Sequence, residues 1–115
     1  MPMRQQVVEA AAGMFAAIGH PTRLRILTLL QQREYDGTEL ATALGLSPSN
    51  VSQHLALLRA HHLVRVRREG THVHYAIRDA RVGRLLDHAL DLLADDAAHA
   101  RDIGRAIQLV RRGRF

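Results

Sequence analysis

Short polar side chains gather at one place in the chain, between positions 47 and 59. Five of them stand close together there: Ser49, Asn50, Ser52, Gln53 and His54. Groups of this size can form hydrogen bonds with base edges in the major groove of duplex DNA, and Asn50 or Gln53 can form two with one adenine. Ser47, Ser49 and Arg59 are better suited to phosphates. The alternative is that they are only the polar start of a solvated helix.

A second cluster, at positions 65–72, is basic and stands beside one turn. Its members are Arg65, Arg67, Arg68, Thr71 and His72. Guanidinium groups placed there can neutralise backbone phosphates, and each neutralised phosphate adds about 0.9 to the slope of log K against log salt. A run of charges is commonly only a solvated face. Because this one follows the polar cluster directly, we predict that it contacts DNA.

The segments that carry the two clusters follow a recognisable order. A turn at 36–38 precedes a short helix over 39–44, which Gly45 ends. Ser47 can cap the next helix, with Pro48 at its first position, and that helix runs to about position 61. Alternating residues over 63–67 and 72–77, with a turn at 68–71, predict a two-stranded hairpin. This order of parts is a winged helix-turn-helix, which recognises duplex DNA.

Amphipathic helices surround this unit. Apolar residues recur at helical spacing over 5–18, over 21–30 and over 79–97, with an interruption near Asp95-Asp96. The predicted fold class is mainly α with a small β-hairpin (α+β), a winged helix-turn-helix in a single domain, 1–115. The apolar stripes over 7–18 and 82–93 exceed what a monomer of this length hides easily, which predicts a homodimer. The residues expected at its interface are Val8, Met14, Phe15, Leu85, Leu86, Ala89 and Leu93.

Composition narrows the class of protein further. Of the 115 residues, 47% are hydrophobic but only 3% are aromatic, so the core must be aliphatic. All 16 basic residues are Arg and the net charge is +5, which favours polyanions, although the arginines also fit the coding bias of a GC-rich genome. The absence of Cys excludes thiolate metal sites. The sequence has no apolar run of transmembrane length and no signal peptide, which predicts a cytoplasmic protein without a membrane partner.

Three segments carry a resemblance to a known family. They are His20-Pro21-Thr22-Arg23-Leu24-Arg25-Ile26-Leu27, the stretch from Leu46 to Arg59, and Arg68-Glu69-Gly70. Together they resemble the ArsR/SmtB family of bacterial repressors, over roughly residues 10 to 93. The resemblance implies a homodimer joined by its first and post-wing helices, repression by operator binding, and release by an inducer that is often a metal ion. Two-fold symmetry would place two recognition helices about 34 Å apart on a pseudo-palindromic operator.

The metal-binding positions that the resemblance implies are mostly without metal ligands here. One site of the family needs thiolates where this chain has Asp36, Thr38 and Ala41. Another needs one Asp and three His, and the matching residues are Asp79, Arg81, Leu92 and Asp95. We therefore predict no metal site and no cofactor. The candidate substitute for Ni(II), Co(II) or Zn(II) is a mixed imidazole and carboxylate face, with a solvated polar face as the alternative: His88, Asp91, Asp95 and His99.

The basic tail over 97–115 lies outside the resemblance. It contains five Arg and one Asp, and we expect it to form a helical extension. Ile103, Ile107 and Val110 would let it lengthen the dimer interface, whereas the arginines at 111, 112 and 114 would let it touch flanking DNA. A disordered end is the third alternative.

The sequence as a whole predicts a sequence-specific DNA-binding repressor that an effector releases or modulates. An enzyme is disfavoured because there is no nucleophile with a base, no Gly-rich phosphate loop and no paired acid and base. A winged-helix module that binds another protein is a rival, although a polar, basic recognition face suits it poorly. Two alternatives keep DNA binding: a ligand-independent regulator controlled by a protein partner, and a metal-responsive regulator that uses the His/Asp face.

Overall fold

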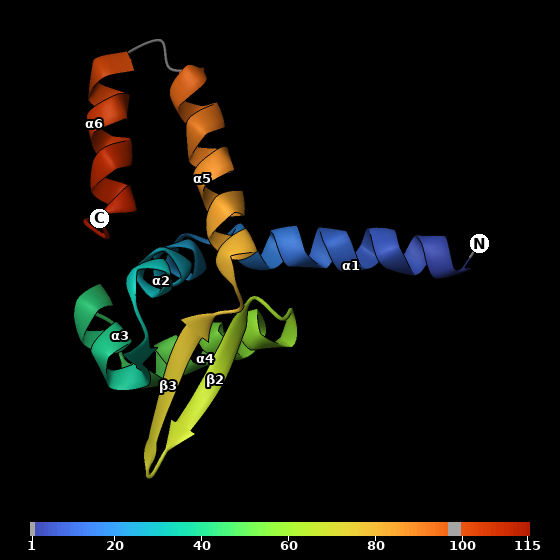
Figure 1. Cartoon of the computed structure of the whole chain (residues 1–115), viewed down its shortest axis with the longest axis vertical. Coiled ribbons are helices and arrows are strands. Elements are labelled where there is room, and N and C mark those ends of the chain that lie inside the picture. The colour runs from blue at the N-terminus through green and yellow to red at the C-terminus, as the bar shows by residue number, and fades with distance from the viewer. Residues whose placement is uncertain (1, 97–99) are drawn as a thin grey trace.

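The computed structural model describes residues 2–96 and 100–115. The elements follow in the order α1 (Pro2–Ile18), α2 (Pro21–Gln32), β1 (Tyr35–Asp36), α3 (Gly37–Leu44), α4 (Pro48–Ala60), β2 (Val64–Glu69), β3 (His72–Ile77), α5 (Ala80–Asp95) and α6 (Ala100–Arg111). In Figure 1, α2, α3, α4 and the sheet form the body, α1 projects to one side, and α5 and α6 rise from it together. Over these described ranges, no helix combines the length and apolar character needed to cross a membrane.

The core is aliphatic, as the scarcity of aromatic residues predicts. Its fully buried side chains come from α2, α3 and α4: Ile26, Leu27, Leu40, Val51, Leu55 and Leu58. Close packing of these side chains joins the three helices into one unit, because any relative movement would open voids among them. The helix-turn-helix is therefore held rigidly on α2.

Local signals set the ends of the two helices in the helix-turn-helix. The Asp36 carboxylate accepts a hydrogen bond from Glu39 N at 2.7 Å, and the Glu39 carboxylate accepts one from Asp36 N at 3.0 Å, which completes a capping box. Gly45 ends α3 with φ 66°, a left-handed conformation that favours glycine. Ser47 Oγ accepts a hydrogen bond from Asn50 N at 3.1 Å at the start of α4. The predicted positions of both helices are thus confirmed.

The predicted hairpin is present, but it belongs to a three-stranded antiparallel sheet in the order β1-β3-β2. β2 and β3 pair along their whole length, so the turn contains only Gly70 and Thr71 and not all of 68–71. The prediction of two strands was incomplete, because β1 adds a third through the pairing of Tyr35 with Tyr75. A strand of two residues is too short to show alternation, so no sequence period could reveal it.

The two helices predicted to form a dimer leave the body of the molecule. α1 fully buries only Ala17, and Met14 and Ile18 pack partly against the core, whereas the N-terminal part of the helix projects outward (Figure 1). α5 ends at Asp95, next to the interruption predicted near Asp95-Asp96. Much of the apolar surface of both helices is therefore open to a partner.

The basic tail folds back on its own chain. α6 lies beside α5 and runs in the opposite direction (Figure 1). Ile107 is buried, and the Arg111 guanidinium donates a hydrogen bond to the Asp91 carboxylate of α5. The amide of Gln32 in α2 donates to the main-chain carbonyl of Arg111 at 3.5 Å. These contacts place α6 at the opposite end of the molecule from the tip of the hairpin.

Candidate nucleic-acid interface

α4 presents its polar residues to solvent because its apolar residues are committed to the core. Val51, Leu55 and Leu58 are at most 2% exposed. The exposed polar side chains of the helix are Ser49, Asn50, Ser52, Gln53 and Arg59. Rotation of α4 about its axis would expose its apolar face, so these polar side chains keep their outward direction.

His54 is the exception in this cluster. Its side chain is half-buried and turns toward α2, where the His20 ring lies 4.7 Å away between ring centroids. The Nδ1 atom lies 3.4 Å from the Arg23 guanidinium. Burial lowers the pKa of His54, and the nearby His20 and Arg23 lower it further. His54 is therefore turned toward α2, unlike its exposed neighbours, and its contact with DNA stays a prediction.

The wing, defined as β2, β3 and the turn between them, divides its basic residues between two faces. Alternate residues of a strand point to opposite sides of a sheet. The register places Arg68 on the same face as Tyr75, and Tyr75 lines a groove of about 470 Å³ between α4 and the wing. Arg59 of α4 lines the same groove. Arg65 and Arg67 are on the other face, so the structure groups only Arg68 with α4.

Arg67 is already bound within the protein. Its guanidinium lies 2.8 Å from a carboxylate oxygen of Glu34 and 2.8 Å from one of Glu69. These hydrogen bonds raise the pKa of Arg67 and lower the pKa of Glu34 and of Glu69. Across residues 2–96 and 100–115, by contrast, no ion pair involves Arg65 or Arg68. The three arginines of β2 therefore differ in how freely they can meet a phosphate.

The tip of the wing consists of exposed polar side chains. Thr71 lies in the turn, and His72 follows it opposite Glu69. The rings of His72 and His74 are stacked with their centroids 6.2 Å apart. Thr71 and His72 thus present hydrogen-bonding groups beyond the end of the sheet.

Sequence reasoning missed Tyr75 as a part of this surface. The alternation of β3 predicts which residues share a face with Tyr75, but it does not predict which helix that face meets. In the structure the half-buried ring lies in the groove beside Ser52 and Arg59. Tyr75 is therefore the residue of the wing that lines this groove with α4.

The residues predicted at a dimer interface fall into three groups. Val8, Phe15 and Leu93 are 63%, 61% and 55% exposed, and Ala89 is exposed as well. Met14 and Leu85 are half-buried against their own chain. Leu86 is only 3% exposed and belongs to the protomer core, so its assignment to the interface was wrong. Helical spacing places Leu85 and Leu86 on one broad apolar stripe. Because α5 packs on the body, Leu86 is buried while Leu85 stays partly exposed.

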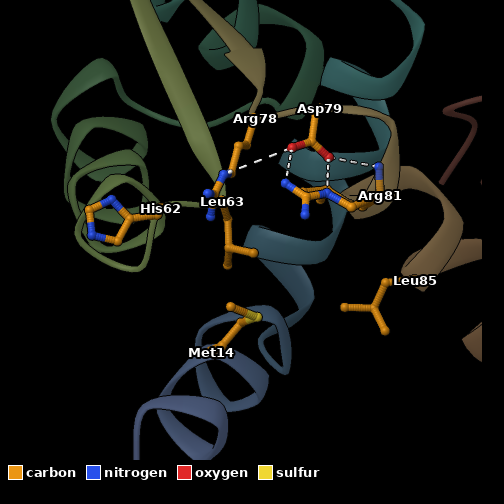
Figure 2. A pocket seen from close by; sticks show the side chains of 8 residues that line it. Met14, His62, Leu63, Arg78, Asp79, Arg81 and Leu85 are labelled. Atoms are coloured by element: carbon orange, nitrogen blue, oxygen red, sulfur yellow. Dashed lines mark hydrogen bonds and ion pairs between the residues drawn. The ribbon is translucent and has the colours of Figure 1, made fainter. Parts of the chain in front are cut away.

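A cavity of about 210 Å³ lies where α1, α5 and the body meet, and Figure 2 shows the side chains that line it. Met14, Leu63 and Leu85 line its apolar side, and Asp79 lies on its polar side. The Asp79 carboxylate accepts hydrogen bonds from the Arg81 guanidinium at 2.7 and 3.0 Å and from Arg81 N at 2.9 Å. These bonds hold the pKa of Asp79 well below its usual range. Asp79 is one of the two carboxylates at the positions that match the second metal site of the family, and it is hydrogen-bonded to Arg81.

The proposed His/Asp face does not form a cluster in the part of the chain that the structure describes. There, no group of three His, Cys, Asp or Glu side chains could hold a metal ion. The Asp91 carboxylate is bound by Arg111 of α6, while His88 and Asp95 are exposed. His99 lies outside the described residues.

Known proteins resemble this chain in both sequence and structure. The family model described as "Bacterial regulatory protein, arsR family" matches residues 20–66. The nodulation protein NolR of Rhizobium meliloti is 38% identical over 95 residues, which cover 83% of this chain and 78% of that protein. A transcriptional repressor SmtB homolog of a Synechocystis strain is 34% identical over 91 residues, which cover 79% of this chain and 64% of that protein. The homodimeric winged helix-turn-helix DNA-binding domain of a Mycobacterium bovis protein superposes with a TM-score of 0.74 at 32% identity, covering 84% of this chain and 88% of that domain.

Proposed function

The chain belongs to the ArsR family of bacterial regulatory proteins, and we propose that it is a homodimeric transcriptional repressor of a pseudo-palindromic operator. One observation carries the proposal: α4 keeps the polar side chains of its first turns exposed, and from Ser52 to Ala60 it shares a groove with Tyr75, which is on the face of the wing that bears Arg68. A recognition helix enters the major groove by its first turns, and a basic hairpin beside it meets the DNA backbone or minor groove. The net charge of +5 adds a general attraction to DNA.

We assign different tasks to the side chains on this surface. Asn50 and Gln53 contact base edges, because an amide can donate and accept toward the same adenine. Arg59 and Arg68 line or border the groove between α4 and the wing and hold phosphates. Ser47 caps α4 through its oxygen lone pair, which leaves its hydroxyl proton free for a phosphate oxygen.

The homodimer follows from the exposed apolar faces of α1 and α5. Phe15 and Val8 project from α1, and Leu93 projects from α5, so all three would be in contact with water in a monomer. Burying such side chains is worth about 1.5 to 3 kcal/mol each. The similar domain from Mycobacterium bovis is homodimeric. A two-fold axis through this interface would place two copies of α4 about one turn of DNA apart, which requires a pseudo-palindromic operator.

The signal that modulates repression is proposed to be something other than a metal ion. Asp79 and Asp91 are each bound by an arginine of the same chain, which would have to be displaced before either could act as a ligand. A small-molecule effector and a protein partner are the two remaining sources of control. We propose that the protein works in the cytoplasm, where bacterial operators are, and we assign it no catalytic role.

The test is the affinity of the purified protein for duplex DNA from the promoter region of its own gene neighbourhood. A random duplex of the same length serves as the comparison, and both are titrated at two salt concentrations. At both salt concentrations, we expect the protein to bind the promoter duplex more tightly than the random duplex. Equal affinity for the two duplexes would reject sequence-specific recognition and favour the protein-binding module.

The same titration, repeated with Ni(II), Co(II) or Zn(II) and separately with a chelator, tests the proposed independence of metal. We expect the affinity for the promoter duplex to stay the same. If one of these metals changes the affinity for the promoter duplex, the His/Asp face that contains His88 would again be the candidate metal sensor.

A further inference from the structure

The C-terminal end of α1 is completed by a side chain from α2. The last four carbonyls of a helix have no partner within it. The carbonyls of Phe15 and Ile18 accept hydrogen bonds from Gly19 N and His20 N, both at 2.9 Å, which leaves those of Ala16 and Ala17 to be satisfied from elsewhere. Arg23 supplies both: Nε donates to Ala17 O at 2.6 Å, and Nη2 donates to Ala16 O at 3.4 Å.

The remaining terminal nitrogen of Arg23 reaches the recognition helix. Nη1 lies 3.4 Å from Nδ1 of His54, which is in the second turn of α4. A guanidinium can only donate, so His54 must accept at Nδ1 and be neutral in this contact. The His20 ring stacks at an angle on that of His54, and its own Nδ1 accepts from Thr22 N at 3.1 Å. One arginine thus holds the end of α1 and the middle of α4 together.

A second contact joins the same two helices. A Cβ atom placed on Gly13 of α1 would lie 2.9 Å from Cε1 of His61, the residue that ends α4. Without a side chain at Gly13, α1 approaches the His61 ring closely, and a larger residue there would require that ring to move. α1 therefore meets α4 at two points along its length, through Arg23 at His54 and through Gly13 at His61.

We propose that Arg23 is a positioning residue that couples α1, the helix available to a second copy, to the operator-facing side of α4. The inference rests on the proposed function, since α1 is assigned to the dimer and α4 to the operator. Gln53 is adjacent to His54 in α4, so a shift of His54 displaces the side chain assigned to base contacts. A change in the angle of α1 would thus alter operator affinity without any new contact to DNA.

The neutral state of His54 makes this link sensitive to acid. Burial lowers the pKa of His54 below its usual 6.5. The charged or titratable groups that act on it are His20 and Arg23, both on the α2 side, while α1 contributes only carbonyls to the contact. Because the pKa is lower in the folded protein, the hydrogen bond is complete above pH 6.5 and breaks as the pH falls through the folded value. A protonated His54 would also repel Arg23.

The test is a double-mutant cycle in operator affinity that combines Arg23→Gln with His54→Ala. Arg23 and His54 are in direct contact, so each single variant should weaken operator binding about tenfold. The double variant should bind the operator only slightly more weakly than either single variant. Arg25→Gln is the matched control, because Arg25 is on the same helix and stands over the Phe115 ring. Additive effects, or an equal effect for Arg25→Gln, would overturn the coupling.

A pH profile separates coupling from a general structural role. His54→Asn keeps an acceptor close to the position of Nδ1 but cannot titrate. Between about pH 7.5 and about pH 5, the wild type should lose operator affinity relative to His54→Asn. Parallel profiles for the two proteins would remove His54 from the mechanism.

A measurement without DNA keeps the inference independent of the proposed function. In backbone amide NMR spectra, Arg23→Gln should shift the signals of α4 around His54, and Arg25→Gln should leave them in place. If the wild type binds no operator, the proposed function fails while this comparison still decides the coupling. Unshifted α4 signals in Arg23→Gln would refute it.

Discussion

Replacing Arg68 with alanine should weaken binding to every duplex and reduce the dependence of that binding on salt. Arg68 is exposed on the wing face that borders α4, and in the described part of the chain it takes part in no ion pair. Its guanidinium is therefore free to neutralise one phosphate in each protomer. Arg67 would be a poor choice for this test, because its removal would also release the carboxylates of Glu34 and Glu69.

The magnitude follows from counterion release. The slope of log K against log salt is negative, and each neutralised phosphate makes it steeper by about 0.9. Removing this guanidinium should therefore make the slope less steep by about 0.9 per protomer, and by about 1.8 for a dimer that binds DNA with both wings. Between about 50 and about 200 mM salt, the wild-type advantage over the variant should shrink about 3.5-fold for each phosphate that is no longer neutralised. Random and operator duplexes should show the same change, because phosphates carry no sequence information.

The assay is a fluorescence-anisotropy titration of operator and random duplexes at several salt concentrations. Arg105→Ala is the matched control, since it removes the same charge from an exposed position on α6, which lies far from the wing (Figure 1). The control should leave the salt slope near the wild-type value. An unchanged slope for Arg68→Ala would refute its phosphate contact, and an equal change in Arg105→Ala would place the basic tail on DNA instead.

Three further substitutions test the remaining assignments. Gln53→Ala should cost about 1 to 3 kcal/mol on the operator and little on random DNA, and equal effects on both would remove its role in base recognition. Phe15→Ser should weaken dimer association by about 2 kcal/mol, the scale of an aromatic interface residue, and unchanged sedimentation would exclude Phe15 from the interface. Leu86→Ala should lower the free energy of unfolding by about 2 to 5 kcal/mol in urea titrations at one protein concentration, because the side chain is in the protomer core. A decrease below about 1 kcal/mol would contradict that placement.

The helix-turn-helix could be predicted from the sequence because its signals are local. A cap such as Ser47 and a left-handed glycine such as Gly45 act within one turn of their own position. Helical spacing likewise predicts that Val51, Leu55 and Leu58 share a face, and all three are buried. The outward direction of Asn50 and its polar neighbours follows from that burial.

Other features depend on neighbours that are distant in the chain. β1 exists because Tyr35 pairs with Tyr75 of β3, and a two-residue strand has no period of its own. The tail showed an amphipathic pattern, but its spacing could not say whether Ile107 would face a second copy or α5 of the same chain. Where such choices remain, only the packing of the whole chain decides between them.

Residues that share one face of a helix or strand can be predicted from the sequence, because the period of the side-chain directions follows from the local φ and ψ angles. What each face packs against depends on the arrangement of the whole chain. This packing directs His54 toward Arg23, pairs Arg67 with Glu34, and buries Leu86 in the core. The physical reason is that such contacts join elements tens of residues apart, and their geometry depends on how all the elements pack at once.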